Sequence, residues 1–166
     1  SKGIKFPATQ VASTDGNTLD DYEEGTWTPV VTGTGTAGTY EPDNTFNKGF
    51  YQKIGRIVTV RAISALASSI TAGGSGSMQI GGLPFNYDVS DNCGSGAVVT
   101  DSVDFTDSAI SNVNIFGLAI TANSGTDAST LRLLLSQDNS GFYTRAIADV
   151  DPLDFIEFTY TYATTA

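Results

Sequence analysis

Short apolar runs separated by turn-forming residues dominate this sequence and constrain its fold most. From Thr26 onward the runs alternate with clusters of Gly, Asn, Asp and Ser, and no ten-residue stretch keeps a helical period. Strands of this length pair through such turns into antiparallel sheets. Thr, Gly, Val and Tyr are frequent whereas Glu, Lys and Leu are scarce, which also favours strands. The sequence therefore predicts an all-β fold, specifically an antiparallel, jelly-roll-like β-sandwich.

Eight segments carry the strand pattern. Residues 50–66 form either two strands or one strand kinked at Gly55, because glycine allows the backbone angles of a turn or bulge. Pro29 lacks an N–H for the ladder, so it indicates a sheet edge or a bulge. We expect a polar loop at 33–47 and turns at 68–77 and 136–141. The expected strands are 26–32, 50–66, 77–81, 95–100, 113–121, 129–136, 141–148 and 154–163.

In two of these segments the order of apolar and polar residues also predicts which faces of the strand are buried. Segment 154–163 alternates strictly, so one face should be buried and the other wet. Segment 113–121 is apolar on both faces, which predicts a central strand covered by a second sheet and a loop or by a neighbouring subunit. The apolar face of 154–163 consists of Ile156, Phe158, Tyr160 and Tyr162.

The chain has 166 residues, which suits one domain with a hydrophobic core. Residues 1–25 lack a sustained period and are expected to form an extended lead-in, with the head domain at 26–166. The chain starts at Ser1 instead of Met, so we expect it to be part of a longer protein. No apolar run approaches the roughly 18 to 20 residues of a membrane span, which predicts no membrane insertion.

A formal net charge of -10, from 18 acidic and 8 basic side chains, argues against a nucleic-acid partner. Affinity for phosphate backbones depends largely on Lys and Arg. An anionic membrane surface is disfavoured for the same reason. Cys93 is the single cysteine and there is no His, so an intrachain disulfide and a Cys/His zinc cluster are excluded by counting.

Catalysis in this chain would have to rely on carboxylates. The absence of His removes Ser-His-Asp and Cys-His schemes and the common zinc hydrolase sites. A glycosidase needs two carboxyls about 5 to 10 Å apart across a cleft. The best cluster is Asp149, Asp151 and Asp154, which also fits a loop that turns at Pro152. We therefore predict that the chain is not an enzyme and has no catalytic residue.

No cofactor or metal is expected. Asp101, Asp104 and Asp107 offer oxygen ligands of the kind that calcium prefers, but they do not form an ordered Asp-x-Asp-x-Asp-Gly loop. The pair Gly81-Gly82 precedes Leu83-Pro84 and no helix, so it is not a phosphate-binding loop.

Several phrases of the sequence point to a known family. LDDYEEGTWTP at 19–29 and FYQKIGRIVTV at 50–60 are the most specific, and KGIKFPATQ at 2–10 and IGGLPF at 80–85 accompany them. With the terminal strand rich in aromatic residues and Thr, they resemble the C-terminal modules of bacteriophage tail fibres and tailspikes. The resemblance covers both ends of the chain, and residues 87–150 have no counterpart in it.

The resemblance implies an all-β head that forms a homotrimer at the end of a fibre, with the lead-in joined to an upstream shaft or tailspike body. Fibre symmetry around one axis and the two-sided apolar segment 113–121 also favour a trimer. Such a protein would be made in the cytoplasm of the bacterial host and carried in the virion tail. Receptor specificity would be expected in the unmatched middle.

Three residues of the shared phrases have expected structural roles. Trp27 is expected to pack in the core or at a subunit seam, because burying aromatic area anchors a segment. Lys53 and Arg56 are two of only eight cations, and we expect them to pair with the acidic lead-in of the same or a neighbouring subunit. Sugar stacking by Trp27 and receptor contact by the two cations are the alternatives.

The fibre-like framework makes carbohydrate the expected ligand. Sugars bind through aromatic faces and through planar polar groups such as carboxylates and amides. Two polar clusters with aromatic residues, in the segments 86–92 and 137–143, carry such groups. The candidate ligand-binding residues are Tyr87, Asp88, Asn92, Asn139, Phe142 and Tyr143.

The sequence thus predicts a tail-fibre or tailspike domain that binds host cell-surface carbohydrate, in capsule or lipopolysaccharide, and helps to trimerise the fibre. Two alternatives remain open. One is a structural module that only closes and trimerises the fibre, and the other is a carboxylate-dependent polysaccharide depolymerase.

Overall fold

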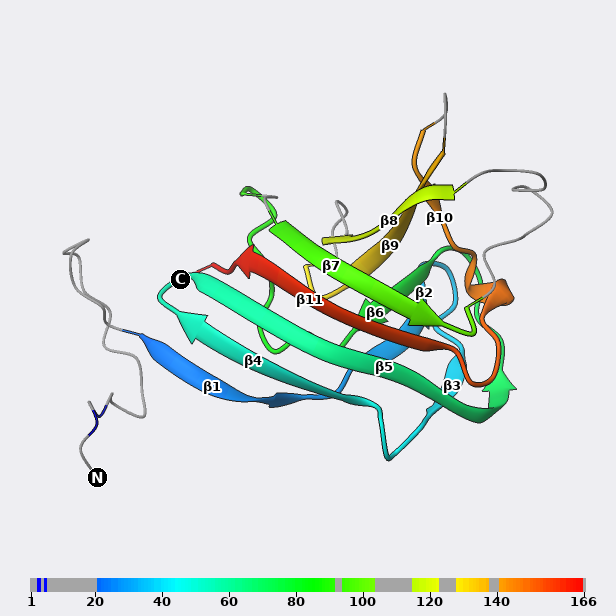
Figure 1. Cartoon of the computed structure of the whole chain (residues 1–166), viewed down its shortest axis with the longest axis horizontal. Helices are drawn as coiled ribbons and strands as arrows, with labels where there is room; N and C mark the ends of the chain where they lie inside the picture. Colours follow the sequence, from blue (N-terminus) through cyan, green and yellow to red (C-terminus); the bar gives the residue numbers. More distant parts are fainter. Residues whose placement is uncertain are drawn as a thin grey trace.

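The computed structural model describes residues 3, 5, 21–91, 94–103, 115–122, 128–137 and 141–165, with the backbone alone at 115–119 and 137. Within these ranges the chain forms strands β1 to β11 and one short 3-10 helix, η1 (Figure 1). No helix among them is long and apolar enough to cross a bilayer.

Two antiparallel sheets pack face to face, which confirms the predicted sandwich. The first sheet has the order β1-β4-β5-β11-β7, and β3 pairs with the far half of β5. It contains β1 (Tyr22–Trp27), β3 (Thr39–Pro42), β4 (Lys48–Ile54), β5 (Ile57–Ala72), β7 (Gly94–Asp101) and β11 (Phe155–Ala163).

The second sheet has the order β10-β9-β6-β2, and β8 pairs with β9. It lies behind the first sheet in the view of Figure 1. Its strands are β2 (Val30–Gly33), β6 (Met78–Gly81), β8 (Ile115–Ala122), β9 (Leu131–Gln137) and β10 (Tyr143–Thr144), and η1 (Ile147–Asp149) follows β10.

Strand β11 is an interior strand of the first sheet, between β5 and the edge strand β7. Its predicted apolar face is buried from Ile156 to Tyr162, whereas Glu157 and Thr159 on the opposite face are exposed. The two-residue period therefore predicted both the strand and its orientation.

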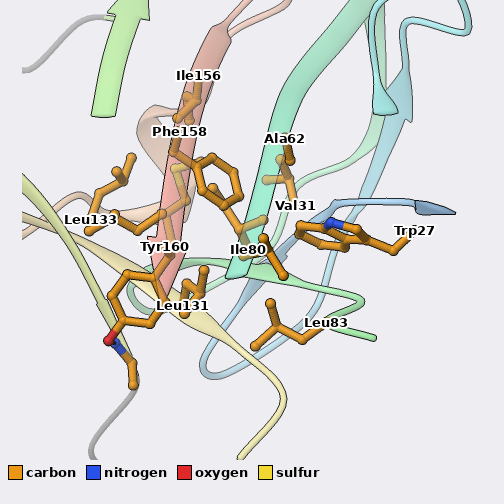
Figure 2. Packing of buried hydrophobic residues seen from close by; sticks show 14 of the residues in the cluster. Trp27, Val31, Ala62, Ile80, Leu83, Leu131, Leu133, Ile156, Phe158 and Tyr160 are labelled. Carbon is orange, nitrogen blue, oxygen red and sulfur yellow. Dashed lines mark hydrogen bonds between the residues drawn. The ribbon is translucent and has the colours of Figure 1, made fainter. Parts of the chain in front are cut away.

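The hydrophobic core fills the space between the sheets (Figure 2). Phe158 and Tyr160 of the first sheet face Leu131 and Leu133 of the second. The Ala122 N–H donates a 2.9 Å hydrogen bond to the Tyr160 hydroxyl, so the buried phenol also joins the two sheets. Each fully buried aliphatic side chain contributes about 1.5 to 3 kcal/mol.

The predicted strand 26–32 is divided by Thr28 and Pro29, where the chain passes from β1 in one sheet to β2 in the other. Both strands lie at a sheet edge, as the proline indicated. Segment 50–66 is two strands, β4 and β5, and Gly55 has a φ of 55° in the turn between them. Here the sequence left two alternatives open, and the hairpin is the one that forms.

The predicted loop 33–47 contains a strand, so that prediction is wrong. Strand β3 pairs with β5, which continues to Ala72 and occupies half of the turn predicted at 68–77. The Tyr40 hydroxyl accepts from the Gly74 N–H at 2.7 Å and donates to the Ile147 carbonyl at 3.2 Å. These long-range contacts hold β3 in place.

Two further strand predictions were wrong in part. Only Tyr143–Thr144 of the segment 141–148 is a strand, and η1 follows. Among the described residues β8 pairs with β9 alone, so 115–122 is an edge strand and not a central one. Strand β1 begins at Tyr22, within the predicted lead-in. The rest of that segment, apart from Gly3, Lys5 and Asp21, lies outside the described residues.

Candidate functional site

The outer face of the first sheet carries exposed side chains, and Figure 1 looks onto this sheet. Phe50 on this face is 44% exposed, although it is flanked by strands on both sides. The register aligns side chains in rows across β1, β4, β5 and β11. One row contains Glu24, Gln52, Thr59 and Thr161, and the next contains Thr26, Phe50, Arg61 and Thr159.

A groove of about 550 Å³ is hollowed into these rows, and we call it the outer-face groove. Its volume lies within the range of about 300 to 1,000 Å³ that is usual for ligand sites. Gly25 and Tyr51 contribute to its floor. The other lining residues are Glu24, Thr26, Phe50, Gln52, Thr59 and Arg61.

A smaller hollow of about 180 Å³, which we call the side pocket, shares Phe50 and Arg61 with the groove. The Arg61 guanidinium lies 5.5 Å from the centroid of the Phe50 ring. The two hollows therefore share this cation–π pair. The side pocket is also lined by Lys48, Ala62, Ile63, Glu157 and Phe158.

A side-chain hydrogen bond joins β1 and β4 on the inner face of the sheet, beneath the groove. The Tyr51 hydroxyl donates to the Glu23 carboxylate at 2.6 Å, and this bond is the main cause that raises the pKa of Tyr51 to about 12. A Cβ at Gly25 would lie 2.7 Å from the Tyr51 hydroxyl, so only glycine leaves room for that ring. Tyr51 also packs edge-on against Phe85, with ring centroids 5.4 Å apart.

The polar groups of the groove are partly oriented by neighbours. The Tyr22 hydroxyl donates to the Glu24 carboxylate at 2.9 Å, which raises the pKa of Tyr22. Thr59 and Thr161 share a 3.0 Å hydrogen bond between their hydroxyls. A carboxylate, an amide, hydroxyls and a guanidinium thus surround one aromatic face, and these groups bind hydroxyl-rich ligands.

The predicted carbohydrate residues lie elsewhere and are not brought together. Tyr87 is 3% exposed and belongs to the core, where its N–H donates to the Ala128 carbonyl. Phe142 is 73% exposed, and Tyr143 of β10 pairs with Leu135 of β9. Figure 1 shows β10 well apart from the C-terminal end of β11. Thr164, which follows β11, forms an isolated β-bridge with Tyr87. Asn92 and Asn139 lie outside the described residues.

Both oxygens of the Asp88 carboxylate contact neighbouring residues. One carboxylate oxygen accepts from the Ser90 N–H at 2.9 Å and from the Ser90 hydroxyl at 2.6 Å. The other oxygen forms a 2.6 Å ion pair with Arg56. The Ser90 hydroxyl bond is the largest of the causes that lower the pKa of Asp88. This carboxylate is therefore ionised and already oriented.

The acidic cluster near the C-terminus holds the fold together. Asp154 forms a 2.9 Å ion pair with Arg145, and both side chains are buried. Arg145 also donates to the Asp149 carbonyl, and the Asp151 N–H donates to Asp154 at 3.0 Å. Burial raises the pKa of Asp154. In the described part of the chain, no three His, Cys, Asp or Glu residues are grouped to hold a metal.

The shared phrases have the predicted structural roles in large part. Trp27 is buried and packs edge-on against Phe158, with ring centroids 6.2 Å apart, which confirms its packing role. Lys53 forms a buried ion pair with Asp21 of the lead-in, as predicted. Arg56 pairs with Asp88 instead of the lead-in, so that half of the prediction was wrong.

The same fold occurs in a tailspike. The chain superposes on part of the Dettilon tailspike protein (gp208) with a TM-score of 0.63, over 86% of this chain. Sequence identity is 13%, so the likeness is one of fold. The match covers 24% of that chain, so this protein spans about a quarter of the tailspike's length. No family model and no curated protein matches the sequence.

Sequence reasoning did not find the residues of the outer-face groove. The signal was present as alternation, because Phe50 and Gln52 in β4 and Thr59 and Arg61 in β5 point to the same side. What the sequence lacked was the register that places Arg61 opposite Phe50 and Glu24 beside Gln52.

Proposed function

We propose that this chain is the head module of a phage tailspike or tail fibre, and that it binds carbohydrate on the surface of the bacterial host. The tailspike-like fold supports this proposal, and so does the resemblance of LDDYEEGTWTP and FYQKIGRIVTV to fibre modules. The protein would act in the virion tail, joined through its lead-in to an upstream shaft or tailspike body.

The outer-face groove is the observation that carries the proposal. It is open and shallow, so it can accept an internal segment of a long polymer as well as a chain end. Phe50 offers an aromatic face for the apolar side of a sugar ring, and Glu24 and Gln52 offer planar groups for its hydroxyls. We assign the main sugar contacts to these three residues.

The loop residues Asp88, Asn92, Asn139, Phe142 and Tyr143 remain a second candidate contact region. Phe142 is the most exposed large hydrophobic side chain among the described residues, as expected for a stacking platform. Tyr87 contributes least to that candidate because its ring is buried.

Binding to host polysaccharide, measured by surface plasmon resonance on immobilised capsule or lipopolysaccharide, tests the proposal and the choice of site together. Phe50→Ala should weaken binding about tenfold, which corresponds to the loss of one stacked aromatic contact. Phe142→Ala is the matched control, because it removes an exposed phenyl ring that does not line the groove. If only Phe142→Ala weakens binding, the loops hold the site. If the wild-type protein binds no host polysaccharide, the carbohydrate proposal fails.

The proposed module is not an enzyme. Asp154, the most buried carboxylate of the C-terminal cluster, is engaged in an ion pair with Arg145, which supports a structural role for it. Prolonged incubation of host polysaccharide with the protein should release no new reducing ends. Their appearance would favour the depolymerase alternative.

A structural role in trimerisation is the second candidate function. Ile54 and Ile57 flank the β4–β5 turn, face each other across it and are each 51% exposed. Exposed branched aliphatic pairs of this kind are typical of subunit contacts. We propose that they contribute to a homotrimer, and a glycan-binding role and a trimer role are compatible in one module.

A further inference from the structure

Two cations on the outer face of the first sheet have no acidic partner. Lys53, Arg56 and Arg145 form ion pairs with Asp21, Asp88 and Asp154. Among the residues that the structure describes, Lys48 and Arg61 form no such pair. In a chain with 18 acidic and 8 basic side chains, two cations without an ion pair on one small area leave that area able to bind an anion from outside the chain.

These two cations lie on the same small area of the sheet. Lys48 is opposite Ile63 and Arg61 is opposite Phe50, so the two side chains are diagonal neighbours on adjacent strands. Both line the side pocket. Glu157, opposite Ile63 on β11, is the one acidic residue that lines it.

Arg61 is held in a binding-competent position without losing its donors. Its guanidinium lies over the Phe50 ring, 5.5 Å from the ring centroid, and a cation–π contact uses the charge of the guanidinium without engaging its N–H donors. The planar fork of arginine binds carboxylate or phosphate with two parallel hydrogen bonds. Lys48 supplies a second, more mobile positive charge.

We propose that the side pocket binds the anionic group, carboxylate or phosphate, of an acidic bacterial polysaccharide. The adjoining neutral sugars would lie in the outer-face groove, on the other side of the Phe50–Arg61 pair. This inference rests on the proposed function and adds the chemical class of its ligand. The net charge of -10 would repel such a polymer elsewhere on the surface, which would restrict binding to this area.

The test compares polysaccharides that differ in charge alone. Acidic capsular polysaccharides and lipopolysaccharides are each paired with a carboxyl-reduced or a dephosphorylated form, and binding is measured by surface plasmon resonance. Arg61→Gln should weaken binding of the acidic form about ten- to a hundredfold, the usual effect of losing charge-assisted hydrogen bonds. It should leave binding of the neutral form unchanged. Arg61→Lys should bind the acidic form more weakly than wild type does but more tightly than Arg61→Gln does. Lys48→Gln should weaken binding of the acidic form and leave binding of the neutral form unchanged.

Lys5→Gln is the matched control, because it removes one positive charge from an exposed residue of the lead-in. If the acidic and neutral forms bind equally, or if Lys5→Gln equals Arg61→Gln in effect, the anionic site is refuted while carbohydrate binding stands. If no polysaccharide binds in either form, both proposals fail. A change in oligomer mass in Arg61→Gln without a change in glycan binding would instead identify the area as a contact between copies of the chain.

Discussion

At the scale of single residues, two buried ion pairs fix the ends of the fold. Lys53 of β4 pairs with Asp21, whose carbonyl also accepts from the Gly55 N–H at 2.9 Å. Arg145 and Asp154 join the segment after β10 to the start of β11. Burial makes each charge depend on its partner, since an isolated charge in the interior is costly.

Asp154→Ala should lower the free energy of unfolding by about 3 to 5 kcal/mol, because it leaves the Arg145 guanidinium buried without its partner. Urea denaturation followed by circular dichroism measures the effect. Asp151→Ala is the control, since the bond of Asp151 to Asp154 uses its backbone N–H, and it should change stability by less than about 0.5 kcal/mol. Equal stability of Asp154→Ala and wild type would show that the pair contributes nothing to the fold.

Ser90→Ala should raise the pKa of Asp88 toward its ordinary value of 3.8, because the Ser90 hydroxyl bond is the largest cause of the lowered pKa. A lowered pKa in the folded state means that ionised Asp88 stabilises the fold above pH 3.8, and that this contribution is lost as the pH falls through the lowered pKa. The stability of Ser90→Ala should therefore depend less on pH in this range than the stability of the wild type does. Carboxyl-carbon NMR titration measures the pKa directly.

Arg56→Gln provides the comparison, because the attraction of Arg56 is a smaller cause of the same shift. It should raise the pKa of Asp88 less than Ser90→Ala does. The reverse order would mean that the ion pair, and not the serine, orients this carboxylate.

At the scale of strands, the sequence was informative where one face of a strand is buried against the core. Strand β11 pairs with β5 and β7 and buries one face against the core, so its alternating pattern and the structure agree. Strand β3 was missed because its pairing depends on the Tyr40 hydroxyl bonds to residues far along the chain. Nothing local in a Gly-rich segment predicts such contacts.

The candidate site was missed for a related reason. The aromatic and polar residues in the predicted loops were conspicuous in the sequence, yet Tyr87 is directed into the core. The groove residues belong to strands β1, β4 and β5, for which the sequence predicted no ligand contact apart from the alternative receptor role of Lys53 and Arg56. Only the register of β1 against β4 shows that Glu24, Gln52 and Phe50 surround one hollow.

Gly49→Ala should disturb the β1–β4 pairing at the edge of the first sheet. Gly49 is opposite Trp27, and a Cβ there would lie 2.3 Å from the indole nitrogen. The aromatic ring covers the glycine across the strands, so any side chain must displace it. Overpacking of this kind costs about 1 to 3 kcal/mol.

The indole is a direct reporter of this change, because the chain contains a single Trp. Fluorescence emission of Gly49→Ala should shift to longer wavelength as Trp27 loses its buried position. Gly73→Ala is the control, since a Cβ at Gly73 meets nothing within 4 Å, and its emission should match wild type. Unchanged emission in both variants would mean that the edge strand adjusts without moving the indole.

At the scale of the whole molecule, one sheet face combines two kinds of surface. The middle rows carry the groove and its cations, whereas the β4–β5 turn at one end carries Ile54 and Ile57. Asp21 and the entry of the lead-in lie beside that turn, as the Gly55–Asp21 hydrogen bond shows. Copies brought together by a common upstream shaft would therefore meet near this end first, and the groove rows would remain accessible.

The double variant Ile54→Asp with Ile57→Asp should abolish self-association. The wild-type protein is expected to have a light-scattering mass of about three times the chain mass of 17.3 kDa. Placing two carboxylates at the contact replaces buried apolar area with charges that repel one another around the axis, so the variant should have the mass of a single chain. Val99→Asp is the control, because Val99 is 67% exposed on the same sheet face but lies in β7, at the opposite edge. If Val99→Asp alone dissociates the trimer, the contact lies at that edge. If the wild-type protein has a mass near that of one chain, trimerisation needs the upstream part of the protein or does not occur.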